Sequence, residues 1–148
     1  MTTHPYIRAY LAGIAVPTML LLLAMTGFFV ARYVWNVPVP IERVIPFPMA
    51  IVPNLFGVWN IFYVSLHSRR HLPIGLHGAL LPFVLAPIAF TVATSLGFLS
   101  VTPRGFVYFQ AITVPYAYLA TGFLCALVLY YLGWKYLVGF LNGLLGIA

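Results

Sequence analysis

The chain has 148 residues, of which 64% are apolar, 17% aromatic and only 5% charged. A water-soluble globular domain carries about a quarter charged residues, so this composition excludes that class and predicts an integral membrane protein. A single acidic residue excludes catalysis by paired carboxylates. The seven Lys and Arg residues are too scattered to form a patch that binds nucleic acid.

The few charged residues divide the chain into apolar intervals, and each interval is long enough for one membrane-crossing helix. A bilayer core about 30 Å thick needs roughly 20 residues of helix. We predict a single all-α domain over residues 1–148, built as an antiparallel bundle of four transmembrane helices with both termini on one side. The predicted spans are residues 9–33, 47–67, 75–98 and 112–134.

The first span, 9–33, follows Arg8 and is longer than the apolar part of a usual signal peptide. No clear A-x-A cleavage site follows it, so we expect it to be retained in the protein. Segment 36–46 carries three prolines around Glu42 and Arg43. Proline fixes φ and lacks a backbone donor, so we expect this loop to stay extended.

The second span is interrupted by Pro53, which removes a helical hydrogen bond and frees carbonyl groups near Met49 and Ala50 for other partners. On helical spacing Phe56, Asn60, Tyr63 and His67 share one face, and we expect that face to point inward. Two interpretations of its polar groups stay open. They form a mid-depth ligand pocket, or Asn60 makes an interhelical hydrogen bond that stabilises the bundle. The candidate ligand or pore residues here are Asn54, Trp59, Asn60 and Tyr63.

The third span is interrupted by Pro82 and Pro87. Small or hydroxyl residues line one face of the third span and one face of the fourth. Thr91 and Thr94 lie in the third span, and Ala117, Thr121 and Cys125 share a face of the fourth. Residues of this kind let helices approach closely in lipid. The alternative is a weakly polar path lined by Thr91, Thr94, Thr121 and the amides.

Four histidines fall on the side that holds the termini, namely His4, His67, His71 and His77. Imidazoles of His67, His71 and His77 are the candidates for binding zinc or for ligating a haem. No Cys, Asp or Glu accompanies them, so no cofactor is favoured. In the other interpretation they lie among lipid headgroups together with Arg69 and Arg70.

Residues 136–148 form a short apolar tail, which is too short to cross a bilayer alone. Gly139 and Gly143 make a G-x-x-x-G pair in it. We therefore expect the tail to lie in the membrane interface or to contact another subunit. Trp134 and its neighbouring tyrosines are expected to anchor the end of the fourth span at headgroup level.

Orientation follows from the Lys and Arg residues beside the spans. The side with the termini has Arg8, Arg69, Arg70 and Lys135, and the other side has Arg32, Arg43 and Arg104. This count places the termini in the cytoplasm of a multi-pass cell-membrane protein. A count so nearly even is also what a dual-topology protein would show.

The sequence predicts a protein that is not an enzyme. Ser65 lies two residues before His67, which puts the two on different helix faces, and no other nucleophile has a base at suitable spacing. We expect a small membrane subunit that assembles with itself or with other membrane subunits in the lipid bilayer. The alternatives are an oligomeric channel or transporter for an ion or small neutral solute, and a haem- or metal-binding membrane protein.

Overall fold

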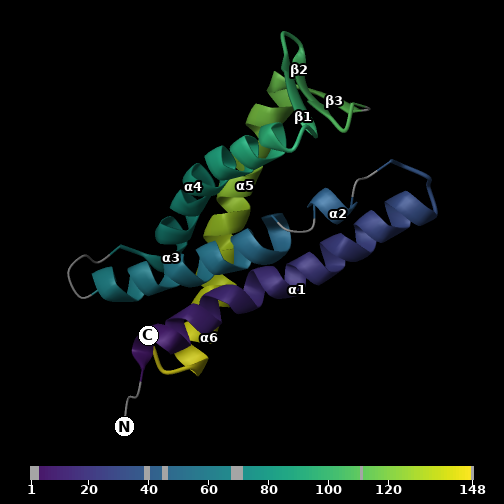
Figure 1. Cartoon of the computed structure of the whole chain (residues 1–148). Coiled ribbons are helices and arrows are strands. Elements are labelled where there is room, and N and C mark those ends of the chain that lie inside the picture. Colours follow the sequence, from purple (N-terminus) through teal and green to yellow (C-terminus); the bar gives the residue numbers. More distant parts are fainter. Residues whose placement is uncertain (1–3, 39–40, 45–46, 68–71, 111, 148) are drawn as a thin grey trace.

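The computed structural model describes residues 4–38, 41–44, 47–67, 72–110 and 112–147. Within these residues, four helices are long and apolar enough to cross a membrane: Pro5–Tyr33, Met49–Leu66, Ile74–Ser95 and Tyr116–Leu144. Successive helices run in alternating directions, and both ends of the chain lie at the same end of the molecule (Figure 1). The predicted set of four apolar helices is thereby confirmed.

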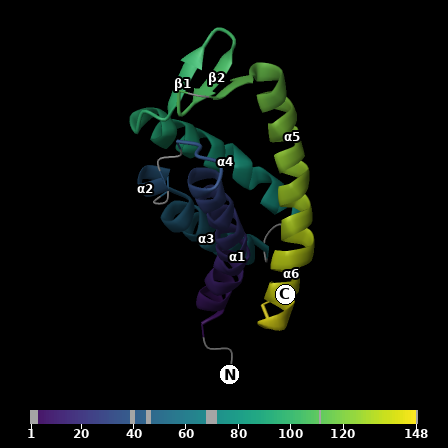
Figure 2. The same cartoon turned by 90° about the vertical axis from the view of Figure 1, so that its right-hand side faces the viewer.

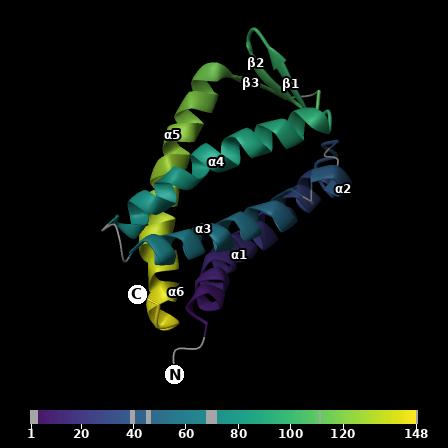
Figure 3. The same ribbon diagram turned by 60° about the vertical axis from the view of Figure 1, so that its left-hand side comes forward.

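Helices α1 (Pro5–Tyr33) and α3 (Val52–His67) lie side by side along much of their length (Figures 1 and 3). Two glycines let their backbones meet. A Cβ atom at Gly13 would lie 2.8 Å from the Cα of Gly57, and a Cβ at Gly57 would overlap the ring of Tyr10. Small residues at a helix crossing allow this close approach in lipid.

The second span begins with a π-helical turn, η1 (Phe47–Ile51), and continues as α3. Pro53 offers no N–H to the preceding turn, and the carbonyl oxygen of Ala50 instead accepts a hydrogen bond from Asn54 Nδ2 at 2.6 Å. The prediction that Pro53 releases a carbonyl near Ala50 is confirmed. Phe56 and Asn60 are buried, so the predicted inward face of this span is also correct.

The proline-rich loop after α1 contains one short helix, α2 (Ile41–Val44), where the sequence suggested an extended chain throughout. Arg32, in the last turn of α1, donates to Oε1 of Glu42 at 2.6 Å. Ile41 is buried against the same end of α1, next to Met25. This ion pair and this apolar contact hold the short helix against α1.

Helix α4 (Ile74–Ser95) ends before the predicted boundary and leads into a small sheet at the end of the molecule opposite the termini (Figure 1). The sheet has three antiparallel strands in the order β1 (Leu99–Thr102), β2 (Gly105–Tyr108) and β3 (Ile112–Pro115). The all-α prediction is therefore incomplete.

Strand β3 replaces the first turn of the predicted fourth span. Ile112, Thr113 and Val114 are β-branched, a class that favours strands. Pro115 has a ψ of 151° and directly precedes the helix. A proline has a fixed φ and no N–H to donate within the sheet, so it suits the end of a strand. The helix consequently begins at Tyr116.

The last helix runs without a break from Tyr116 to Leu144 and forms one column along the molecule (Figure 2). It comprises α5 (Tyr116–Leu132), a π-helical segment η2 (Gly133–Val138) and α6 (Gly139–Leu144). The predicted helix boundary near Lys135 is wrong. The exposed Lys135 side chain places its ammonium 5.9 Å and 5.2 Å from the ring centroids of Tyr131 and Tyr136, which is the range of cation–π contacts.

The core lies where this column meets α3 and α4. Trp134, Val138 and Asn142 are all buried at intervals of four residues. In a regular α-helix such a series drifts around the axis, and the wider π turn reduces the drift. The ring of Trp134 occupies the space that a Cβ at Gly78 would need. Trp134 is therefore a core residue, which corrects its predicted place at headgroup level.

We expect Gly13→Ala to weaken the fold by about 1–3 kcal/mol, because the new methyl group meets the backbone of α3 and forces the two helices apart. The measurement is reversible unfolding in mixed detergent micelles, followed by circular dichroism. Gly27→Ala is the matched control, since a Cβ at Gly27 has no atom within 4 Å. Equal stability of the two variants would contradict the close packing of α1 on α3.

Candidate functional site

The most buried polar groups are two asparagine side chains, which bond to each other. Asn60 Nδ2 donates to Asn142 Oδ1 at 2.8 Å, and Asn142 Nδ2 donates to Asn60 Oδ1 at 3.1 Å. Asn60 Nδ2 also donates to the carbonyl oxygen of Ala9 at 2.8 Å. We call Asn60, Asn142 and the Ala9 carbonyl the amide cluster. It joins α3, α6 and α1 at one point.

The amide cluster decides between the two interpretations of Asn60. Its side chain is 0% exposed, and both of its polar atoms have partners within the chain. A buried amide pair of this kind stabilises helix packing, and both N–H groups of Asn60 are used within the chain. The sequence suggested this bond for Asn60 but not its partner, because Asn142 lies beyond the predicted fourth span.

Trp59 and His77 form a second reciprocal pair, between α3 and α4. Trp59 Nε1 donates to the carbonyl oxygen of His77 at 2.9 Å, and His77 Nε2 lies 2.9 Å from the carbonyl oxygen of Trp59. A carbonyl oxygen can only accept, so Nε2 carries a proton and donates. The two rings also stack, with centroids 5.0 Å apart.

Two further aromatic rings enclose His77. The Tyr63 and Trp134 ring centroids lie 5.3 Å and 5.6 Å from that of the imidazole. Among the described residues, Trp134 Nε1 is the one buried side-chain polar atom that has no hydrogen-bond partner. Tyr63, Trp59 and His77, which the sequence left unconnected, thus form one aromatic cluster with Trp134.

The predicted metal or haem site rests on His67, His71 and His77. The side chain of His67 and all of His71 lie outside the described residues, as do Arg69 and Arg70, the predicted headgroup contacts. His77 Nε2 already donates to Trp59, which leaves Nδ1 as the nitrogen with a free lone pair. No group of three His, Cys, Asp or Glu side chains comes together in the described parts of the chain.

Asn54 lies apart from the amide cluster and is exposed. Its Oδ1 accepts a hydrogen bond from the Tyr10 hydroxyl, and its Nδ2 donates to Ala50. These contacts fasten the interrupted start of the second span to α1. The local role of Asn54 is therefore to satisfy the carbonyl that Pro53 releases.

The candidate threonines bond to their own helices. Thr91, Thr94 and Thr121 donate to the carbonyl oxygens of Pro87, Phe90 and Ala117 at 2.8–2.9 Å. Thr91 is 14 residues beyond His77 on α4, about 21 Å at the rise of an α-helix. The structure does not bring the threonines and the amides together into one polar path.

The glycine pair of the tail lies on α6, on either side of the buried Asn142. A Cβ at Gly139 would lie 3.4 Å from the carbonyl oxygen of Trp134 and 3.8 Å from Ile74 Cγ2, whereas a Cβ at Gly143 would meet nothing within 4 Å. Gly139 thus faces its own chain, and Gly143 faces open space. Their predicted contact with a second subunit stays a prediction.

An apolar groove of about 640 Å³ lies between α1, the start of α3 and the column α5–η2. This size falls in the range of small-molecule sites. No charged side chain lines it, and its polar groups belong to one tyrosine and one tryptophan. The lining residues are Val16, Pro17, Leu20, Leu21, Val52, Phe56, Leu129, Tyr130, Leu132, Gly133, Trp134, Leu137 and Val138. The groove could not be predicted from the sequence, because its walls come from three separate segments.

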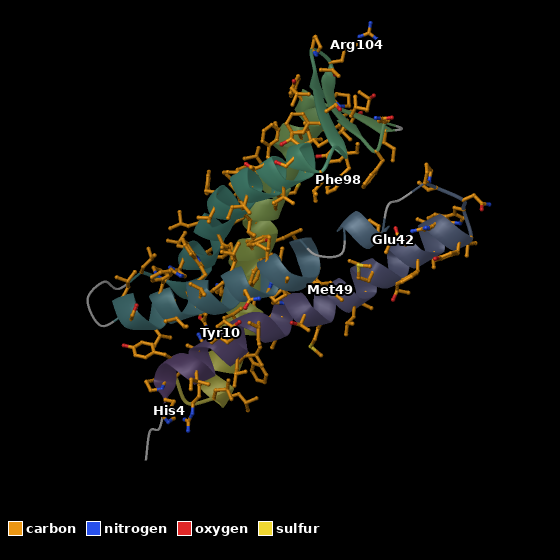
Figure 4. All side chains as sticks on the ribbon, viewed as in Figure 1. His4, Tyr10, Glu42, Met49, Phe98 and Arg104 are labelled. Carbon is orange, nitrogen blue, oxygen red and sulfur yellow. The ribbon has the colours of Figure 1, made fainter. Side chains whose placement is uncertain are left out.

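The sheet at the opposite end carries Arg104 at its tip, far from His4 and the termini (Figure 4). Thr102 accepts a hydrogen bond from the Tyr116 hydroxyl at 2.7 Å through its carbonyl oxygen, which ties β1 to α5. Burial raises the pKa of the Tyr108 phenol in β2, so this side chain is neutral at physiological pH.

Comparisons with protein-family models, with curated proteins and with solved structures give no match to this chain.

We expect Asn142→Ala to destabilise the protein by about 1–2 kcal/mol, because it leaves Asn60 Oδ1 buried without a donor. In a double-mutant cycle of Asn60→Ala and Asn142→Ala, unfolding in micelles should give a coupling energy of about 0.6–1.7 kcal/mol.

Thr18→Ala is the control for this cycle, since the Thr18 hydroxyl is exposed and bonds to Ile14 within its own helix. Its effect should stay within about 0.5 kcal/mol. A coupling energy of zero would show that the two amides act independently.

Proposed function

We propose that the protein is a non-enzymatic membrane subunit that spans the bilayer four times and associates with a second copy through α5. One observation supports this proposal above the others. Helix α5 has no buried residue, and the most apolar 18-residue stretch of the whole column is only 11% buried. A spanning helix with so few buried residues leaves much of its surface to lipid or to another subunit.

The face of α5 offered to a second copy carries Ala117, Thr121 and Cys125. These three exposed residues recur at every fourth position, which places them along one side of the helix. The Thr121 hydroxyl is already satisfied by Ala117, so it enters an apolar interface at no cost in hydrogen bonding. Small side chains in such a row allow two helices to pack closely in lipid.

Cys125 is the single cysteine of the chain and is exposed, so it reports directly on this association. Mild oxidation of membranes should give a disulfide-linked dimer that persists when the protein is diluted with excess lipid. Ala117→Leu should lower the yield severalfold, because the larger side chain separates the helices. The readout is non-reducing electrophoresis.

Ala24→Leu is the matched control, since Ala24 is an exposed alanine on the spanning helix α1. Its dimer yield should equal that of the unchanged protein. Cys125→Ser should abolish the dimer altogether. A dimer that Ala117→Leu leaves unchanged, or one that disappears on dilution with lipid, would contradict association through this face.

We further propose one orientation in the cell membrane, with both termini in the cytoplasm. Its support is the count made from the sequence, four Lys or Arg residues for the terminal side against three for the other, in which Lys135 is included although it lies within the last helix. The test uses Cys125→Ser with either His4→Cys or Arg104→Cys, both at exposed positions. A membrane-impermeant maleimide should label the cysteine at 104 in intact cells and the cysteine at 4 only after permeabilisation. Labelling of both in intact cells would indicate dual topology.

A further inference from the structure

The apolar groove is open along its side, and its rim belongs to the surface that faces the surroundings. Leu20 is 58% exposed, and Leu129 and Leu137 are 67% and 50% exposed, yet all three line the groove. The groove is thus continuous with the outer apolar surface of the spanning helices. If these helices cross a bilayer as proposed above, the mouth of the groove opens into the hydrocarbon layer.

The amide cluster lies beyond one end of the groove. Phe56, in one wall, lies one helical turn before Asn60, and Val138, in another wall, lies one turn before Asn142. The three walls therefore converge where α1, α3 and α6 are bonded together. The lining of the C-terminal column extends from Leu129 to Val138, about 13 Å at the rise of an α-helix.

We propose that this groove binds one acyl chain of a bilayer lipid. An uncharged wall matches an uncharged chain, whereas a headgroup would find no cation among the lining residues. Water is a poor occupant, because it needs two to four polar partners, and the lining offers few. The proposal depends on the membrane placement given above but not on association through α5.

The lining predicts which feature of a lipid sets its affinity. A longer chain makes more van der Waals contacts with the groove wall, so chain length controls binding. Headgroup charge has little effect, since no charged side chain lines the groove. This pattern separates an acyl-chain site from a headgroup site, in which anionic lipids bind more tightly.

Gly133→Leu tests the site directly. Gly133 lines the groove, and a Cβ there has no atom within 4 Å, so a leucine side chain fills empty space without displacing the core. Gly27→Leu is the matched control, because Gly27 is equally unobstructed but does not line the groove.

The measurement is native mass spectrometry of the detergent-solubilised full chain, titrated with dioleoylphosphatidylcholine. We expect retention of one lipid by the unchanged protein and by Gly27→Leu, and severalfold weaker retention by Gly133→Leu. Dioleoylphosphatidylglycerol should bind as the choline lipid does. Dioctanoylphosphatidylcholine should bind severalfold more weakly, because its shorter chains make fewer contacts with the groove wall.

Equal retention by Gly133→Leu and Gly27→Leu would overturn the proposal, and so would a preference for the anionic lipid. If Gly133→Leu abolished the dimer while lipid retention stayed the same, the groove would hold a second copy and the acyl-chain proposal would fail. Cross-linking of Ala117→Leu through Cys125 distinguishes this result from failure of the α5 interface, because Ala117 does not line the groove.

Discussion

Two primary amides buried among apolar helices must satisfy each other, and the rest of the arrangement depends on that requirement. An amide facing hydrocarbon without a partner is costly. Asn60 and Asn142 avoid this cost by bonding to each other, and Asn60 also donates to Ala9. This bonding fixes the depth of α6 relative to α1 and α3. The π turn at Gly133–Val138 then allows Trp134 and Asn142 to face the same core.

The other parts of the molecule are held more loosely. Helices α1 and α3 form one closely packed pair, whereas α4 and α5 contact each other and separate toward the sheet (Figure 3). The Trp59–His77 pair and the packing of Trp134 on Gly78 join α4 to α3 and to the C-terminal column. Away from these contacts the helix surfaces stay uncovered, and the apolar groove lies between the column and the first pair. Association and lipid binding are thus proposals about surfaces that the chain leaves unfilled.

Hydropathy and charge spacing predicted the four apolar helices and the inward face with Phe56 and Asn60, because burial in lipid dominates the choice of residue type there.

Predictions from residue type alone were wrong where the packing of side chains had the larger effect. Lys135 resembles the end of a span, but the helix continues past it to Leu144. Trp134 resembles an interfacial anchor, yet the missing Cβ of Gly78 makes room for it in the core. Three short strands were missed, because a short apolar run does not by itself distinguish a strand from a helix. The candidate site was predicted in part, with Asn60 identified and Asn142 missed.

The bond between Asn60 and Asn142 joins residues 82 positions apart, which has a consequence for biogenesis. When α1 and α3 have entered the membrane during synthesis, the amide of Asn60 has its contact with Ala9 but lacks its main partner. It stays so until α4, the sheet and the whole C-terminal column have been made and inserted. Early folding intermediates therefore hold an incompletely paired polar group. The bond between Asn60 and Asn142 forms only after α6 has been synthesised.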